Sequence, residues 1–244
     1  MPYGWLLTVK GNVTVSPDFP GSKTYGFVVY PSFSLRKEGT AEGFNAPDDG
    51  ISLALFGDSR WAAGVVGRYQ TGRYTGDDRR KLTGIQDAKW ALEPGLFAEF
   101  WPMQDTLRLR GEMRFGINGY NGLVGNLSLD YVQRVGKFVI SGGPRMALAG
   151  TDYMETYFGV TQQDAFNNAQ VTYYKPDAGV KSVGLAAAAT YKWNDNWATT
   201  VNAGYDRLVG SAADSPIVKN LGTNNQFTFG ASASYTFPLG YLPR

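Results

Sequence analysis

The sequence contains no cysteine and no histidine among its 244 residues. Without histidine there can be no Ser-His-Asp or Cys-His catalytic set, no imidazole proton shuttle and no histidine metal ligand. Zinc and iron–sulfur sites lose their usual ligands when both residue types are missing, so we expect no metal and no cofactor. The lack of thiols is also typical of an oxidising compartment. These absences argue against an enzyme and favour a protein of the cell envelope.

Long apolar runs and a strong net charge are missing as well. No stretch of 18 consecutive apolar residues occurs, which excludes a transmembrane helix. Charged residues make up 18% of the chain and the net charge is only +2, so no nucleic-acid partner is expected. The opening residues, MPYGWLLTVK, do not have the basic and apolar regions of a signal peptide. If the protein is exported, we expect this sequence to be a mature form.

Aromatic residues (14%) and a two-residue alternation of apolar and polar side chains are abundant. Such alternation places successive side chains on opposite faces of an extended strand, and it averages the hydropathy of a membrane strand to near zero. We expect eleven strand segments: Trp5–Ser16, Tyr25–Leu35, Ile51–Phe56, Trp61–Thr71, Pro94–Trp101, 106–118, Leu123–Gln133, Phe138–Leu148, Val183–Trp193, Trp197–Leu208 and Phe227–Phe237.

The lengths of these segments and of their connections indicate a membrane barrel. Many segments have 10 to 12 residues, whereas soluble strands average about 5–6 and tilted membrane strands need about 9–11. Short connections alternate with long polar ones at 72–91, 149–178 and 209–225, which is the asymmetry of outer-membrane barrels. The sequence therefore predicts one domain, 1–244, that forms an all-β, closed antiparallel transmembrane β-barrel of 10–12 strands. Twelve is preferred because bacterial barrels usually have even numbers. A soluble β-sandwich is the alternative.

Charged residues gather on one face of a few strands. In the stretch TLRLRGEMRFGIN (106–118), leucine, methionine, phenylalanine and isoleucine alternate with arginine and glutamate. In a barrel the apolar set faces lipid and the charged set faces the lumen. The predicted lumen cluster is Arg108, Arg110, Glu112, Arg114, Arg145 and Asp130. Paired charges that merely fill a narrow barrel are one interpretation, and a selectivity or solute-binding cluster is the other.

Several short sequence motifs, hereafter the motif words, are more specific to one kind of protein than the alternation of apolar and polar residues is. They are TVSPDFPGS (14–22), EPGLFAEF (93–100), DYMETYFGVT (152–161), DAGVKSVGLAAAATY (177–191) and DRLVGSAADSPIV with GTNNQF (206–227). With these words the chain resembles the MipA/OmpV family, the MltA-interacting proteins of the outer membrane, over roughly residues 10–237. The most specific motif residues are Thr156, Tyr157, Phe158, Gly159, Asp214, Ser215 and Pro216.

The resemblance implies an outer-membrane barrel without enzymatic activity. The family's named role is a scaffold that links a lytic transglycosylase to a penicillin-binding protein during murein growth. We therefore expect an interaction protein of the outer membrane, in contact with membrane lipid and lipopolysaccharide, with peptidoglycan-remodelling enzymes as partners. A narrow pore or solute-binding barrel with an arginine-lined lumen is the alternative function.

Overall fold

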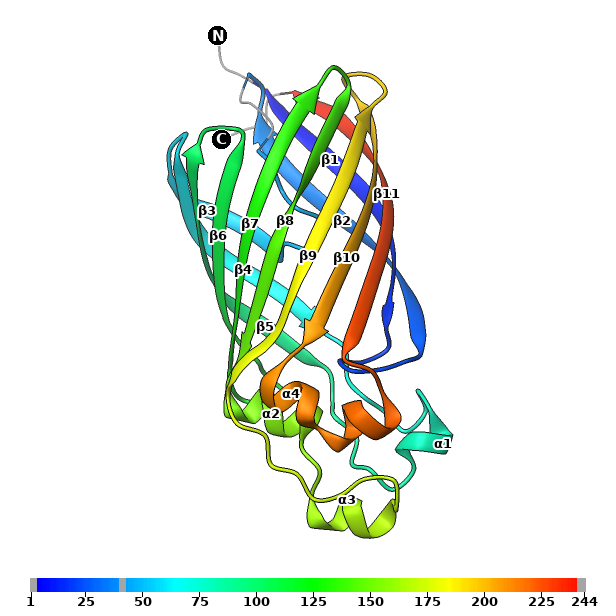
Figure 1. Ribbon diagram of the computed structural model, residues 1–244. Coiled ribbons are helices and arrows are strands. Elements are labelled where there is room, and N and C mark those ends of the chain that lie inside the picture. Colours follow the sequence, from blue (N-terminus) through cyan, green and yellow to red (C-terminus); the bar gives the residue numbers. More distant parts are fainter. Residues whose placement is uncertain (1–3, 40–42, 241–244) are drawn as a thin grey trace.

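The computed structural model describes residues 4–39 and 43–240, and all strands in these ranges belong to one curled antiparallel sheet (Figure 1). Its strand order is β2-β1-β11-β10-β9-β8-β7-β6-β5-β4-β3. The eleven strands of these ranges agree with the predicted 10–12. They are β1 (Trp5–Pro17), β2 (Tyr25–Lys37), β3 (Ile51–Gly57), β4 (Trp61–Gln70), β5 (Ala91–Met103), β6 (Leu107–Phe115), β7 (Leu123–Val135), β8 (Phe138–Ala149), β9 (Gly179–Lys192), β10 (Trp197–Leu208) and β11 (Asn225–Gly240).

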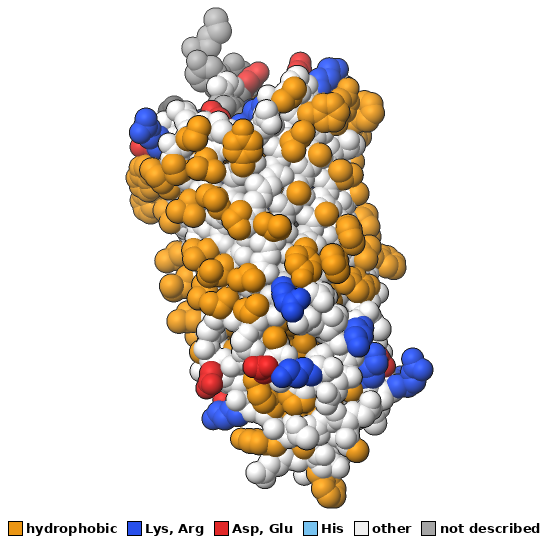
Figure 2. Space-filling view, in the orientation of Figure 1, with side chains coloured by type: hydrophobic (Ala, Val, Ile, Leu, Met, Phe, Trp, Pro, Cys, Tyr) orange, Lys and Arg blue, Asp and Glu red, His pale blue; other side chains and the backbone are white. Residues whose placement is uncertain are grey.

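The outer wall of the barrel is apolar and its inner face is polar. On β6, Leu109 and Met113 are 47% and 63% exposed, whereas Arg108 and Arg110 are buried. Figure 2 shows apolar side chains spread over the barrel wall, with charged ones towards the two ends. The alternation on this strand is therefore arranged as predicted. An apolar wall of strands that are mostly 9 to 16 residues long suits a bilayer.

The two rims of the barrel differ. Short turns at 58–60, 104–106, 136–137 and 193–196 lie at one rim, near the start of β1 and the end of β11 (Figure 1). The long connections lie at the opposite rim and contain all the helices of the described residues. These are α1 (Arg79–Leu82), α2 (Thr151–Phe158), α3 (Gln162–Asn167), α4 (Gly210–Asp214) and the π-helix η1 (Ile217–Leu221). None of these helices is long and apolar enough to cross a bilayer.

The prediction of a fully closed barrel is not met in the described part of the chain. The sheet ends at β2 and β3, which are its two edge strands. β3 has only seven residues and begins opposite Gly67, in the middle of β4. The residues before it, FNAPDDG (44–50), are rich in turn formers rather than strand formers. This segment enters the lumen instead of extending β3, and the ladder therefore stops short of closing.

Aromatic side chains gather where strands meet the short turns. Phe138, Tyr191 and Trp193 form one series of ring contacts, with centroids 4.8 and 4.7 Å apart. Trp197 and Tyr235 form another contact at 4.9 Å. Amphipathic rings favour the boundary between lipid and water. Their position supports the reading of this rim as one edge of the bilayer-spanning wall.

Candidate functional site

The lumen contains a network of buried ion pairs along β4 to β8. Five guanidinium groups face six carboxylates, so the network is nearly neutral as a whole. Its members are Arg68, Arg108, Arg110, Arg114 and Arg145 with Asp48, Asp49, Glu93, Glu99, Glu112 and Asp130. The alternation of the strands directs these side chains inward. Buried charges require such pairing, because an isolated ion in a low-dielectric interior is costly.

Asp130 joins two arginines at the centre of this network. Its Oδ2 accepts from Arg108 Nη2 at 2.6 Å, and its Oδ1 accepts from Arg145 Nη2 at 2.7 Å. Arg108 lies on β6, Asp130 opposite it on β7, and Arg145 on β8, so three adjacent strands supply the three side chains. A shared carboxylate between two planar guanidinium groups fixes their relative positions.

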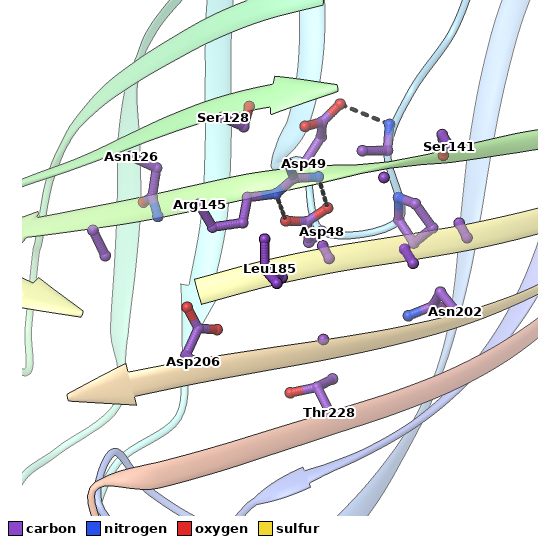
Figure 3. Close-up of a pocket in the computed structure, with 18 of the residues that line it drawn as sticks. Asp48, Asp49, Asn126, Ser128, Ser141, Arg145, Leu185, Asn202, Asp206 and Thr228 are labelled. Atoms are coloured by element: carbon purple, nitrogen blue, oxygen red, sulfur yellow. Dashed lines mark hydrogen bonds and ion pairs between the residues drawn. The ribbon is translucent and has the colours of Figure 1, made fainter. Parts of the chain in front are cut away.

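The segment 43–50, hereafter the lumen segment, places two further carboxylates on these arginines. Asp49 accepts from Arg108 Nη1 at 2.6 Å and Nη2 at 3.0 Å. Asp48 accepts from Arg145 Nε at 2.6 Å and Nη2 at 3.1 Å (Figure 3). Each arginine thus holds one carboxylate through two parallel hydrogen bonds, the strongest geometry available to this pair. The Phe44 ring lies 4.7 Å from the Arg108 guanidinium and adds a cation–π contact.

The network continues towards the helical end of the barrel. Arg110 donates to Glu112 at 3.0 Å and to Glu99 at 3.1 Å. Arg114 pairs with Glu112 and donates to Glu93 at 2.9 Å. Glu93 also accepts from the Tyr120 hydroxyl at 2.6 Å. Tyr120 belongs to the connection between β6 and β7, so the charge network is physically joined to the cap of the barrel.

Three cavities lie along the lumen, with volumes of about 280, 310 and 460 Å³, and Pro47 and Asp49 border all three. The wall formed by β1, β2 and β9–β11 contributes mainly small polar side chains to them, such as Ser32, Thr200 and Thr228. Figure 3 shows Asp206, Asn202 and Thr228 across the cavity from Arg145. The lumen is therefore a polar space that is interrupted at its middle by the lumen segment.

A helical cap lies at the end of the barrel that carries the long connections (Figure 1). Its main apolar core, hereafter the cap core, includes residues of α2, α4 and η1 together with strand ends: Ala88, Ala91, Tyr120, Val124, Ala149, Tyr153, Met154, Tyr157, Phe158, Leu208, Ala212 and Val218. A second cluster packs Phe19, Leu82, Ile85, Val160, Val171, Ile217 and Leu221. The cap thus has the dense apolar packing that the charged lumen lacks.

The two most specific motif words meet inside this cap. Ser215 Oγ donates to the Phe158 carbonyl at 2.7 Å and accepts from the Ile217 amide at 3.2 Å. Tyr157 and Phe158 have no exposed surface, and Ser215 is equally buried. These words were read as loops from the sequence. The structure places Thr156, Tyr157 and Phe158 in α2, with Gly159 directly after it, while Asp214, Ser215 and Pro216 join α4 to η1.

Buried polar groups tie the long connections to α2. Arg73 Nη1 donates to the Tyr157 carbonyl at 2.6 Å and its Nη2 donates to the Gln86 carbonyl at 3.0 Å. Burial lowers the pKa of Arg73 to about 10, and the guanidinium stays charged at neutral pH. Burial raises the pKa of Tyr153 and Tyr157, and burial together with the charge of Glu93 raises that of Tyr120. The cap therefore holds neutral phenols.

The predicted lumen residues lie together in the structure. All six, Arg108, Arg110, Glu112, Arg114, Arg145 and Asp130, belong to the network described above. The predicted cluster lacks Arg68, Glu93, Glu99 and the two aspartates of the lumen segment. The signal for Glu93 and Glu99 was present, because they share one face of the alternating stretch 91–103. No periodic signal marks Asp48 and Asp49. No group of three or more metal-ligating side chains occurs within the described ranges.

The fold, the apolar wall and the charged lumen define this chain as an outer-membrane β-barrel. Residues 11–237 match the family described as MltA-interacting protein MipA. The chain therefore belongs to the MipA family and is a protein of the outer membrane. The search of curated proteins finds no match.

Among solved structures, the chain is similar to several outer-membrane channels. The NanC porin shares 10% identity at a TM-score of 0.45, with 94% of this chain and 98% of that chain covered. The CymD monoaromatic hydrocarbon channel shares 11% at 0.44, with 99% and 90% covered. An outer membrane channel from Pseudomonas putida shares 11% at 0.43, with 97% of each chain covered. The sequence identities and TM-scores are too low for the solutes of these channels to indicate a solute of this protein.

Proposed function

We propose that this barrel is a non-enzymatic interaction protein of the outer membrane that binds peptidoglycan-remodelling enzymes, and that it does not carry solutes across the membrane. The observation that carries the proposal is the obstruction of the barrel at two levels. The cap core fills one end, and the lumen segment occupies the middle. The name of the family, MltA-interacting protein, supports a lytic transglycosylase as the partner. A penicillin-binding protein is the second proposed partner, and lipid and lipopolysaccharide contact the outer wall.

The short-turn rim is the surface we propose for these partners. Outer-membrane barrels turn their short connections towards the periplasm, where peptidoglycan lies. Arg134, near the end of β7, and Lys137, in the turn between β7 and β8, are exposed at this rim. Exposed cations next to a flat ring of aromatic side chains suit a protein partner with an acidic face.

A pull-down with purified components tests the proposal. The immobilised barrel, in detergent, is expected to retain a purified lytic transglycosylase, and Arg134→Ala with Lys137→Ala should weaken retention. Lys175→Ala with Lys219→Ala removes the same charge from the capped end, where these lysines are 65% and 58% exposed, and should leave retention unchanged. If the parent protein does not retain the transglycosylase, or if both pairs of substitutions weaken retention equally, the proposed surface is wrong.

A further inference from the structure

The lumen segment has few ties to the barrel apart from its two carboxylates. No residue of 43–50 belongs to a strand. Its contacts with the wall include the ion pairs of Asp48 and Asp49 and two further hydrogen bonds, from Arg68 to the Asp48 carbonyl and from the Gly50 amide to Glu112. The Phe44 ring also contacts the Arg108 guanidinium and the Trp101 ring. Asp48 keeps 43% of its side chain exposed to the cavity. The segment thus reaches the wall largely as a pair of adjacent carboxylates presented to two arginines.

The arginines are held in place without the segment. Arg108 and Arg145 both donate to Asp130, and Arg145 also donates to the Leu129 carbonyl at 3.1 Å. Neighbouring Arg110 packs its guanidinium 4.1 Å from the Phe97 ring, and its buried Nη2 forms an ion pair with Glu112 at 3.0 Å. If Asp48 and Asp49 were withdrawn, five guanidinium groups would face four carboxylates. The wall would then offer the guanidinium groups of Arg108 and Arg145, each with two parallel N–H donors available, and a net positive charge.

We propose that the Arg108–Asp130–Arg145 cluster is a binding site for small anions with two or more carboxylates, and that Asp48 and Asp49 occupy it as an internal competitor. Planar guanidinium forks recognise carboxylates by the same paired hydrogen bonds that now hold the aspartates. The cavity of about 280 Å³ is bordered by Arg145 together with Asp48 and Asp49, and it provides space for a small solute. The site is independent of the proposed interaction with peptidoglycan enzymes.

A single cysteine reports on the competition, because the natural chain has none. Ala46 of the lumen segment is only 5% exposed. In the Ala46→Cys protein, citrate should displace the segment and speed maleimide labelling about tenfold relative to sodium chloride of equal ionic strength, which corresponds to about 1.4 kcal/mol. Acetate, with one carboxylate, should have a much smaller effect. Labelling that responds equally to citrate, acetate and chloride overturns the proposal.

A direct measurement of citrate binding tests the same site. Asp48→Asn with Asp49→Asn removes the internal competitor, and calorimetry should detect citrate binding about tenfold tighter than in the parent. Asp58→Asn with Asp195→Asn makes the same charge change in two short turns and should bind citrate as the parent does. Adding Arg145→Gln to the first pair should abolish the gain. Equal citrate affinity in the two double variants contradicts the assignment, whatever the outcome of the pull-down.

Discussion

At the scale of single residues, most buried charges of the lumen have more than one partner of opposite charge. Arg108 has no exposed surface and contacts Asp49 and Asp130. A buried ion pair contributes little net free energy compared with apolar packing, yet removal of one partner leaves an uncompensated charge. The network therefore makes the lumen sensitive to single substitutions, which gives the first prediction.

Arg108→Gln should lower the free energy of unfolding by about 3–5 kcal/mol, because Asp49 and Asp130 both lose the buried guanidinium that they share. Unfolding in urea from lipid vesicles, followed by tryptophan fluorescence, measures the change. Arg134 is 39% exposed at the short-turn rim, and Arg134→Gln should stay within about 0.5 kcal/mol of the parent. Equal effects of the two substitutions would show that Arg108 is not part of a buried network.

Met113→Lys tests the outward face of β6. Met113 is 63% exposed near the middle of this strand, so the lysine should cost about 2–4 kcal/mol in a bilayer. Val135→Lys, at the short-turn end of β7 where the side chain is 55% exposed, should cost only about 0–1 kcal/mol. If the Met113→Lys protein inserts and is as stable as the parent, this face of β6 does not point towards lipid.

The residue pattern predicts the direction of side chains on β6 but not all their partners. Alternation at Arg108, Arg110, Glu112 and Arg114 directs these side chains inward from local sequence alone. The Asp49 contact joins residues 59 positions apart through an irregular segment, and no local pattern reports such a contact.

At the scale of elements, the cap and the wall depend on different forces. The wall strands are joined by ladder hydrogen bonds and carry apolar side chains on their outer face, whereas the cap helices are held by an apolar core and by buried hydrogen bonds. α2 has eight residues and α3 has six, too short to be stable without such packing. A capping box at Thr161 and Asp164 stabilises the start of α3.

Phe158→Ala should open the cap while the barrel persists. The side chain is fully buried, and its removal costs about 3–5 kcal/mol. Limited proteolysis should cut the connection between β8 and β9 much faster, while the strands stay resistant. Phe166→Ala on α3 provides the matched control, since Phe166 is 86% exposed and should change the cutting rate little. Protection that survives Phe158→Ala would mean that the cap core does not hold this connection.

The buried phenols make the cap sensitive to alkali. Burial raises the pKa of Tyr120, Tyr153 and Tyr157, whereas the same groups ionise near pH 10 when unfolded. Their contribution to stability is therefore complete below about pH 10 and is lost as the pH rises further. Tyrosinate absorbance should rise abruptly above this pH, together with loss of cap protection. A gradual titration centred near pH 10 in an intact cap would contradict the burial.

The strands follow from the sequence far better than the cap does. Alternation and length predict most strand boundaries to within about three residues, and the start of the alanine-rich β9 to within four, because an apolar outer wall and a polar lumen impose a strict period of two. The predicted closure is not met within the described residues, where β2 and β3 are edge strands and residues 43–50 are irregular. The short cap helices have no long periodic pattern, since contacts between distant connections stabilise them.

At the scale of the whole molecule, the chain combines a barrel wall of the outer membrane with an interior that is obstructed twice. Two of the motif words meet in the cap, where Ser215 contacts Phe158, and they therefore help to hold the cap together. A barrel built in this way presents its surfaces to partners on either side of the membrane. This arrangement is the basis for the proposed role in binding rather than transport.

Conductance in a planar bilayer tests this central claim most directly. With the purified protein inserted, and insertion verified by heat-modifiable gel mobility, we predict no steady current in symmetric potassium chloride. Phe158→Ala combined with Asp48→Asn and Asp49→Asn, which loosens both obstructions, should produce a measurable current in the same membrane. A steady ohmic conductance from the parent protein would contradict the account.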